Sequence, residues 1–203
     1  MLVIGLCGGS GSGKGEVCRA FLEHSIPSID TDAVYHRLTA EKNSLTDALA
    51  ERFGADILDE RGALLRPVLA KKVFAADGAE ALADLNRITH FHILNVARVW
   101  LEEQRKNGVF AAIVDAPLLF ESGFDKECDI TVCVTAPRQK RIERIVLRDG
   151  ISCEAAQRRI ASQKSDAYLI ERCGYHIDNC GDVGALRARV KRIVDELREK
   201  ENM

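Results

Sequence analysis

A run of glycines near the amino end constrains this chain more than any other feature. Residues 8–14 read Gly-Gly-Ser-Gly-Ser-Gly-Lys and match the pattern G-x-x-x-x-G-K, between an apolar run over residues 2–7 and a helical pattern from Lys14 to about Ser25. Glycines let the backbone turn tightly, so that consecutive N–H groups point at one anion, and the following helix adds the positive end of its dipole. The pattern therefore predicts a site for nucleotide phosphates rather than a merely glycine-rich turn. The residues expected to bind are Gly8, Gly11, Ser12, Gly13 and Lys14, whose ammonium adds a full positive charge.

The loop departs from its usual pattern at one position. A Ser or Thr ordinarily follows the lysine, and its hydroxyl contacts Mg²⁺. This chain has Gly15 there, followed by Glu16. Gly15 has no side-chain ligand to offer, whereas Glu16 could bind a metal, repel the triphosphate or favour the first turn of the helix. The sequence therefore predicts phosphate binding at this loop, including Gly15 and Glu16, and leaves direct metal anchoring open.

Apolar runs alternate with helical patterns along most of the chain. The clearest strand candidates are Val109–Val114, Ile130–Val134 and a short Tyr175–Asn179, with a weaker one at Ser25–Asp30 that Pro27 interrupts. Continuous apolar runs suit strands that are buried on both faces of a parallel sheet. The pattern predicts an α/β fold with a mostly parallel sheet flanked by helices. At 203 residues, one compact domain is expected over residues 1–203.

Three helical regions follow from the periodicity. The stretch from about Leu65 to Gln104 has no strand candidate, which predicts a helical insertion over about 62–107. Arg138–Arg148 and Ser152–Gln163 read as two helices joined at Asp149-Gly150, with Ser152 able to cap the second. Val183–Lys200 is an amphipathic helix that suits packing against a sheet.

Charge and composition exclude several classes of function. The formal net charge of −2 argues against a nucleic-acid partner, which needs an excess of Lys and Arg. No apolar stretch reaches the roughly 18 residues of a membrane span, and no basic residue precedes Lys14 as a secretion signal requires. A cytoplasmic location is therefore expected. The seven cysteines are odd in number and contain no C-x-x-C pair, which predicts reduced thiols acting as small apolar side chains rather than disulfides or a zinc site.

Beyond the loop, the chain resembles the dephospho-CoA kinase family over nearly its whole length. The loop alone would fit other small-molecule kinases. Two further elements in this order point to this family: Ile29-Asp30-Thr31-Asp32, and Asp115-Ala116-Pro117-Leu118-Leu119-Phe120-Glu121. The remaining matches are Phe53-Gly54, Leu85-Asn86 with Ile88 and His90, Arg144 with Arg148-Asp149, Arg159-Ile160 with Gln163, and Ile177-Asp178-Asn179.

The resemblance implies a fold and an activity. It implies a P-loop kinase core with a helical CoA-side insertion at about 62–107 and a helical, arginine-bearing lid at about 138–165. It implies transfer of the γ-phosphate of ATP to the ribose 3′-hydroxyl of dephospho-CoA, the last step of coenzyme A synthesis, with Mg²⁺. ATP and dephospho-CoA are then the small-molecule partners. The sequence carries no signal for an oligomeric state.

The catalytic base is expected to be Asp32. It follows the second strand at the carboxyl edge of the sheet, where open α/β sheets bind ligands, and a carboxylate there can accept a hydroxyl proton. The alternative is a turn or N-cap aspartate before residues 33–38. Asp30 is left open between orienting Asp32, holding a metal-bound water and itself taking the proton.

Other roles combine position with the resemblance. Asp115 follows a strand and would hold the metal, chiefly through water, unless it is a strand-end cap. Arg144 is expected to act in catalysis and Arg148 to bind ATP; they share a helix face with Arg141, and the alternative is a solvated basic face. Arg141 stands where the family has an uncharged polar residue and receives no role. The further ATP-side residue is Asn179, and the further substrate-side residues are Arg66, His90, Pro117, Leu118 and Glu121.

Two other functions stay open on the sequence. The same fold could phosphorylate a different nucleoside or nucleotide. Alternatively, because Gly15 replaces the loop's hydroxyl residue, the chain could be a nucleotide-binding protein with weakened catalysis.

Overall fold

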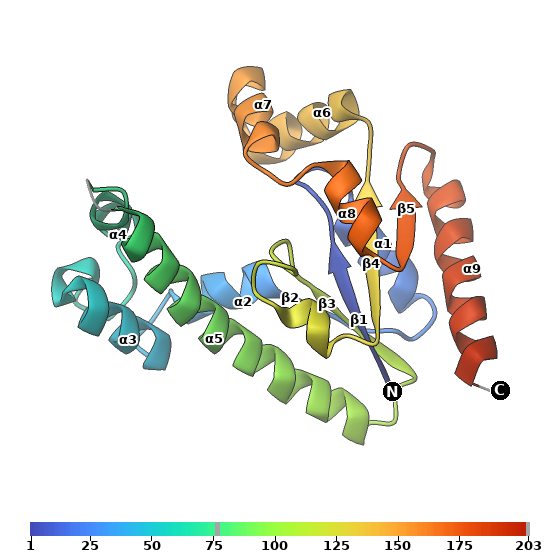
Figure 1. The fold of residues 1–203 in the computed structure, drawn as a ribbon, viewed down its shortest axis with the longest axis horizontal. Helices are drawn as coiled ribbons and strands as arrows, with labels where there is room; N and C mark the ends of the chain where they lie inside the picture. Colours follow the sequence, from blue (N-terminus) through green and yellow to red (C-terminus); the bar gives the residue numbers. More distant parts are fainter. Residues whose placement is uncertain (76–77, 202–203) are drawn as a thin grey trace. The chain divides into compact units, whose positions relative to one another are not determined.

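The computed structural model describes residues 1–75 and 78–201 and contains a five-stranded sheet. Its strands are β1 (Leu2–Cys7), β2 (Ser28–Asp30), β3 (Ala111–Asp115), β4 (Ile130–Thr135) and β5 (Tyr175–Asp178). They lie in the order β2-β3-β1-β4-β5, and β1 pairs in parallel with both β3 and β4, as β4 does with β5 (Figure 1). The predicted α/β fold with a mostly parallel sheet flanked by helices is confirmed.

The central strands are buried because their side chains are apolar on both faces. All five residues of β3 are buried, as are the last five of β1. The helices α1 (Lys14–Leu22) and α9 (Val183–Glu201) pack against this sheet and against each other. Their contribution to the core comes from Val17, Ala20, Phe21, Leu186, Val190, Ile193, Val194 and Leu197. The strand registers bring the carboxyl ends of β1, β3, β4 and β5 to one edge of the sheet.

Element boundaries differ from the sequence expectation in small, explicable ways. The first helix ends at Leu22 rather than near Ser25, whose φ of 62° lies in the left-handed region. The weak strand candidate shortens to Ser28–Asp30, directly after Pro27, which cannot donate a ladder hydrogen bond. The strand predicted from Val109 begins at Ala111.

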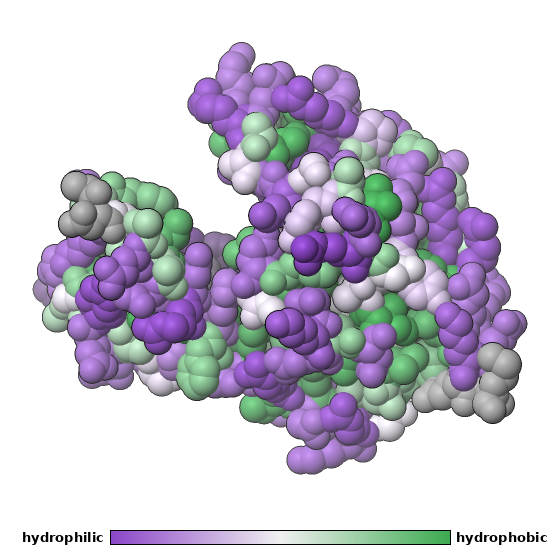
Figure 2. Space-filling view, viewed as in Figure 1, coloured by the Kyte–Doolittle hydropathy of each residue, from purple (hydrophilic) through white to green (hydrophobic). Residues whose placement is uncertain are grey.

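Three α-helices lie between β4 and β5 in the described sequence, and two of them were predicted. They are α6 (Arg138–Asp149), α7 (Cys153–Ala161) and α8 (Asp166–Arg172). Ser152 caps α7 as expected, since its Oγ accepts from Ala155 N at 3.2 Å. Ile142 and Ile145 of α6 pack on Ala156 of α7, and the α6–α7 pair lies beyond the strand ends with hydrophilic side chains on its outer surface (Figures 1 and 2). The unpredicted α8 has seven residues, too few for a periodic pattern. A short 3₁₀ helix at Phe124–Glu127 precedes β4.

The chain divides into two compact units. The first holds Met1–Ser28 and Gln104–Met203, and the second holds Ile29–Glu103. The second unit contains α2 (Thr31–Leu38), α3 (Ser44–Phe53), a 3₁₀ helix at Ala55–Ile57, α4 (Arg66–Val73) and most of α5 (Gly78–Lys106). Its own core consists of Leu45, Leu49, Phe53, Ile57, Leu64, Leu69 and Val73. The insertion expected at about 62–107 covers α4 and α5, whereas the second unit already begins at Ile29. Residues 76–77 of the expected insertion lie outside the described residues.

Within the described ranges, no helix has the length and apolar character needed to cross a lipid bilayer.

Candidate active site

The loop Gly8–Gly13 joins β1 to α1 in a conformation that requires glycine. Gly8 has a φ of 153° and Gly13 a φ of 97°. A Cβ on Gly13 would lie 2.1 Å from Asn179 Nδ2, and one on Gly8 would lie 2.5 Å from the carbonyl oxygen of Val134. Among the residues that the structure describes, no side chain caps the start of α1 at Gly13, so N–H groups of its first turn remain available to an anion.

Lys14 lies at the start of α1 and faces the end of β3. Its Nζ is 3.7 Å from Asp115 Oδ1 and donates to the Gly8 carbonyl at 3.4 Å. The side chains of Lys14 and Asp115 are 15% and 11% exposed, so water screens this ion pair only weakly. The structure thus brings together two predicted site residues, one for phosphate and one for metal.

The surroundings of Gly15 and Glu16, the two residues after the lysine, argue against direct metal binding by either residue. An ideal Cβ on Gly15 would have no neighbouring atom within 4 Å, so the position is open as well as ligand-free. The Glu16 carboxylate pairs with Arg19 along α1, with Arg19 Nε donating to Oε2 at 3.2 Å and a second contact from Nη2.

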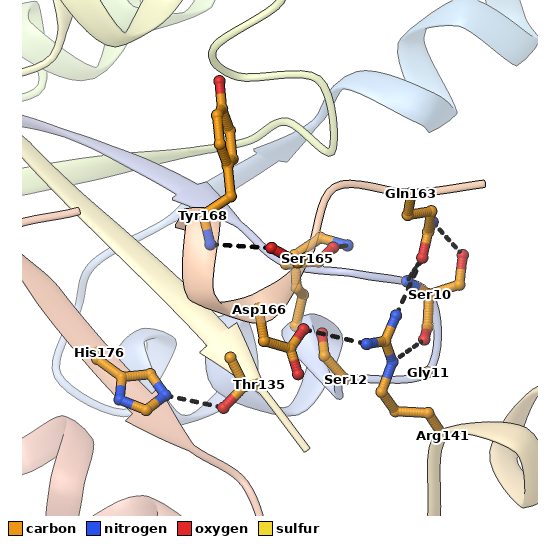
Figure 3. Close-up of polar contacts among 12 residues, drawn as sticks. Ser10, Gly11, Ser12, Thr135, Arg141, Gln163, Ser165, Asp166, Tyr168 and His176 are labelled. Carbon is orange, nitrogen blue, oxygen red and sulfur yellow. Dashed lines mark hydrogen bonds and ion pairs between the residues drawn. The ribbon is translucent and has the colours of Figure 1, made fainter. Parts of the chain in front are cut away.

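Arg141, a buried arginine of α6, hydrogen-bonds to the phosphate loop. Arg141 is 5% exposed, and its Nε donates to the Ser10 carbonyl at 2.9 Å (Figure 3). Its Nη1 donates to Asp166 Oδ1 at 3.1 Å and its Nη2 to Gln163 Oε1 at 3.0 Å. Gln163 in turn accepts from Ser10 N and donates to Ser10 Oγ, each at 2.9 Å. The sequence reasoning gave Arg141 no role, although its spacing from Arg144 placed it on the same helix face.

Arg144 and Asn179 hold the middle of the loop. Arg144 Nη1 donates to the carbonyls of Gly11 and Ser12 at 3.0 and 3.2 Å. Asn179, which is buried, donates to the Ser12 carbonyl at 2.8 Å. Ser12 is only 1% exposed, and its hydroxyl has no hydrogen-bond partner among the described residues. Three predicted residues therefore meet at the phosphate loop, and one of them presents an unused polar group.

Arg148 lies in the last turn of α6 and pairs with Asp149. Its Nε and Nη2 donate to the Asp149 carboxylate at 2.7 and 3.0 Å, and Arg159 of α7 pairs with the same carboxylate. Arg148, which has the larger effect, and Arg159 lower the pKa of Asp149 from its ordinary 3.8 to about 2. The carboxylate stays ionised at neutral pH and links the ends of α6 and α7.

A cavity of about 260 Å³ lies beside the loop within the first unit. It joins the loop glycines, the segment after β3 and the connection between α7 and α8. The lining residues are Gly8, Gly9, Pro117, Leu118, Glu121, Ser162, Gln163, Lys164 and Leu169. The predicted residues Pro117, Leu118 and Glu121 thus share one cavity with the phosphate loop. Of the α7–α8 lining residues, Gln163 was singled out from the sequence, whereas Ser162, Lys164 and Leu169 were missed.

In the second unit, Asp30 rather than Asp32 caps α2. Asp30 Oδ1 accepts from the backbone N–H groups of Asp32 and Ala33 at 2.8 and 3.2 Å. Asp32 is an exposed residue in the first turn of that helix. The alternative in which Asp32 serves as the cap is therefore wrong.

Arg66 begins α4 and joins a small polar cluster in the same unit. Its Nη2 lies 2.6 Å from His36 Nδ1 and donates to Thr39 Oγ1 at 3.2 Å, and its guanidinium lies 5.4 Å from the centre of the Tyr35 ring. Burial raises the pKa of Tyr35, so this phenol stays neutral beside Arg66. His90 lies half-buried on α5.

Solved structures share the arrangement of sheet, loop and helices. A protein from Thermus thermophilus is 27% identical, with a TM-score of 0.77 over 97% of each chain. The shikimate kinase of Acinetobacter baumannii is 16% identical, with a TM-score of 0.54 over 98% of this chain and 94% of its own, and shows a shared fold alone. A parallel sheet with this glycine loop between β1 and a helix that begins with lysine defines the class of P-loop kinases.

Sequence comparison narrows the class to one family. The family model for dephospho-CoA kinase matches residues 2–184. A dephospho-CoA kinase of Corynebacterium efficiens is 37% identical over 197 residues, which are 97% of this chain and 98% of that protein. The dephospho-CoA kinase of Syntrophotalea carbinolica is 36% identical over 97% of this chain and 92% of its own. The chain belongs to the dephospho-CoA kinase family, which confirms the resemblance drawn from the motifs.

Proposed function

We propose that the protein transfers the γ-phosphate of ATP to the ribose 3′-hydroxyl of dephospho-CoA, releasing ADP and coenzyme A. The observation that carries this proposal is the cavity in which Gly8 and Gly9 of the phosphate loop meet Pro117, Leu118 and Glu121. A phosphate donor on the loop and an acceptor against the segment after β3 are then neighbours. Membership of a kinase family supports ATP as the donor.

The chain's contribution to this transfer is positioning and charge. Backbone N–H groups of the loop and the start of α1 bind the phosphates, and Lys14 moves its ammonium from Asp115 toward the β- and γ-oxygens. Arg144, which already reaches the loop carbonyls, neutralises charge that develops on the transferred group. Little covalent chemistry is required of the protein.

Asp32 takes the proton in this proposal. The 3′-oxygen forms a bond to the γ-phosphorus, the bond from that phosphorus to the bridging oxygen of ADP breaks, and the hydroxyl proton passes to the Asp32 carboxylate. Asp30 is committed to capping α2, which supports Asp32 over Asp30 in this role. Arg66 supplies a cation to an acceptor phosphate; its guanidinium contacts the His36 imidazole, the Thr39 hydroxyl and the Tyr35 ring.

Mg²⁺ belongs to the same proposal, and the donor set fits it. This ion prefers one or two carboxylates together with phosphate oxygens and water. Asp115, buried at the end of β3, is a carboxylate of this kind and would hold the ion chiefly through water. Water would also take the place of the hydroxyl that Gly15 does not offer. When bound, the metal neutralises charge on the β- and γ-phosphates.

The test is product analysis with a panel of acceptors. The full-length protein is incubated with ATP and Mg²⁺ and, separately, with dephospho-CoA, adenosine, AMP and shikimate, and phosphorylated products are identified by mass. We expect one phosphate to be added to dephospho-CoA and none to shikimate. Phosphorylation of a nucleoside without reaction of dephospho-CoA would show that the proposed acceptor is wrong. ATP binding without any product would support a nucleotide-binding protein instead.

A further inference from the structure

Three cysteines from distant parts of the sequence meet behind the phosphate loop. Cys7 ends β1, Cys133 lies beside it on β4 in the paired register, and Cys173 follows the last turn of α8. The Sγ atoms of Cys7 and Cys173 are 3.6 Å apart, although the two residues are separated by 166 positions. The Cys173 thiol also interacts with the Cys133 thiol and raises its pKa. Among the described residues, no group of His, Cys, Asp and Glu is arranged to hold a metal ion, so this cluster is not a metal site.

The three thiols differ in access and in acidity. Cys7 and Cys133 are 1% and 0% exposed, whereas Cys173 is only partly buried. Hydrogen bonds from Cys133 and Cys7, and a further one involving Thr131, lower the pKa of the Cys173 thiol, and His176 acts in the same direction. The contact with Cys173 and burial raise the pKa of Cys7 and of Cys133. The most accessible thiol of the cluster is therefore also its most acidic, which is the combination found in redox-sensitive cysteines.

We propose that Cys173 is a hydroperoxide-sensitive thiol whose oxidation ends in a disulfide with Cys7. The Cys173 thiolate attacks one oxygen of the hydroperoxide, the O–O bond breaks, and hydroxide or alkoxide leaves. Cys173 is then a sulfenic acid. The Cys7 sulfur attacks Cys173 Sγ, the S–S bond forms, and the hydroxyl leaves as water with the Cys7 proton. Two thiols lose two electrons in total, and the hydroperoxide gains them.

The disulfide would act on the phosphate loop through Cys7. The Sγ–Sγ separation of 3.6 Å must fall to about 2.05 Å, so Cys7 and the end of α8 must approach each other. Gly8 follows Cys7 directly; its backbone lies so close to Val134 that a Cβ would not fit, and its carbonyl accepts from Lys14. A shift at Cys7 is therefore passed to the first residue of the loop. The proposal goes beyond the transfer reaction, since it concerns a modification site and nucleotide affinity.

The test follows the disulfide and nucleotide binding, and neither measurement requires catalysis. The full-length protein is treated with graded hydrogen peroxide, free thiols are alkylated, and the cross-linked peptides are mapped by mass. Binding of ATP is measured by calorimetry before oxidation, after it and after reduction by dithiothreitol. We expect a Cys7–Cys173 cross-link and a Kd for ATP raised about tenfold, with full recovery on reduction.

Matched variants separate this disulfide from general oxidation. Cys173→Ser removes both the cross-link and the loss of affinity, and Cys173→Ala serves if that variant folds poorly. Cys153→Ser, at an exposed cysteine of α7, leaves both unchanged, and Cys133→Ala leaves the cross-link in place.

Three results would overturn the proposal. The first is a cross-link from Cys173 to Cys133. The second is a Cys173 that stays reduced while the exposed Cys153 and Cys180 are oxidised. The third is an oxidative loss of ATP affinity that persists in Cys173→Ser. A Cys7–Cys173 cross-link with an unchanged Kd would overturn the coupling to the phosphate loop.

Discussion

Arg141 and Gln163 hold Ser10 of the phosphate loop between them. Arg141 Nη2 donates to Gln163 Oε1 at 3.0 Å, Arg141 Nε donates to the Ser10 carbonyl, and Gln163 bonds to the Ser10 amide and hydroxyl (Figure 3). The same guanidinium reaches Asp166 at the start of α8. One buried side chain therefore connects α6, the α7–α8 segment and the loop.

We expect Arg141 to be a positioning residue for ATP. In Arg141→Ala, Ser10 loses one support and Asp166 its partner, so KM for ATP should rise about tenfold. KM for dephospho-CoA should stay within about twofold, a difference of roughly 0.4 kcal/mol. Arg141→Lys should recover only part of the effect, because an ammonium cannot replace the guanidinium fork. Steady-state kinetics with each substrate varied in turn measure this split. Arg138→Ala, at the exposed first residue of α6, is the control. Equal rises in both KM values would indicate a general structural role instead.

The strands could be predicted because burial on both faces leaves a continuous apolar run. The runs at β1, β3 and β4 are of this kind, and each of these three strands begins within two residues of its predicted start. The seven-residue α8 gave no periodic signal, and its stabilising cap at Ser165 is a local contact that many loops share. Similarly, only Asp32 was considered from the sequence as a cap of this helix, and the backbone geometry shows that Asp30 is the cap.

The site was predictable where one short segment carries it, as in the loop at residues 8–14. It was not predictable where partners come from distant segments. The spacing of Arg141, Arg144 and Arg148 placed all three on one face, but Arg141 is buried by Gln163 and Asp166, which lie 22 and 25 positions away. The cysteine cluster was missed for the same reason.

Lys14 should be essential to the chemical step. Its ammonium lies between the loop and Asp115, and in the proposed function it stabilises charge on the transferred phosphate. We expect Lys14→Ala to lower kcat at least about 100-fold, roughly 2.7 kcal/mol of transition-state stabilisation. The measurement is single-turnover transfer at saturating ATP. Lys191→Ala, at an exposed residue of α9, should match the unaltered protein, and a kcat retained in Lys14→Ala would contradict the assignment.

The two aspartates at the start of α2 can be separated by paired substitutions. Asparagine caps helices as well as aspartate does, so Asp30→Asn keeps the hydrogen bonds to residues 32 and 33 and should change kcat by less than about threefold. Asp32→Asn removes the proposed proton acceptor and should lower kcat at least about 100-fold. Thermal unfolding of both variants checks that α2 is intact. If Asp30→Asn were the slower enzyme, the proton would pass to Asp30.

The junction of α6 and α7 should respond to acid through Asp149. Arg148 and Arg159 lower the pKa of this carboxyl in the folded state from 3.8 to about 2. Because the folded-state value lies below the unfolded-state value, the ion pairs stabilise the fold fully above about pH 4 and lose their effect as the pH falls toward about 2. The difference in Tm between the protein and Asp149→Asn should be constant from neutral pH down to this window and shrink within it. Carboxyl-carbon NMR reports the pKa directly, and an ordinary value near 3.8 would contradict the ion-pair geometry.

Gly15 offers a direct test of how the loop manages without its usual hydroxyl. The position has no atom within 4 Å of an added Cβ, so Gly15→Ser should fold normally. If Asp115 and water already fill the metal's coordination in the unaltered enzyme, the new hydroxyl replaces a water, and kcat should change by about threefold or less. The concentration of Mg²⁺ that gives half-maximal rate should fall, because a protein ligand is held in place before the metal binds.

Titration of activity with Mg²⁺ in both proteins measures the two effects together, with Gly15→Ala as the control for removing a glycine. A tenfold or larger gain in kcat for serine over alanine would show that the natural loop is catalytically impaired and would favour the weakened nucleotide-binding alternative.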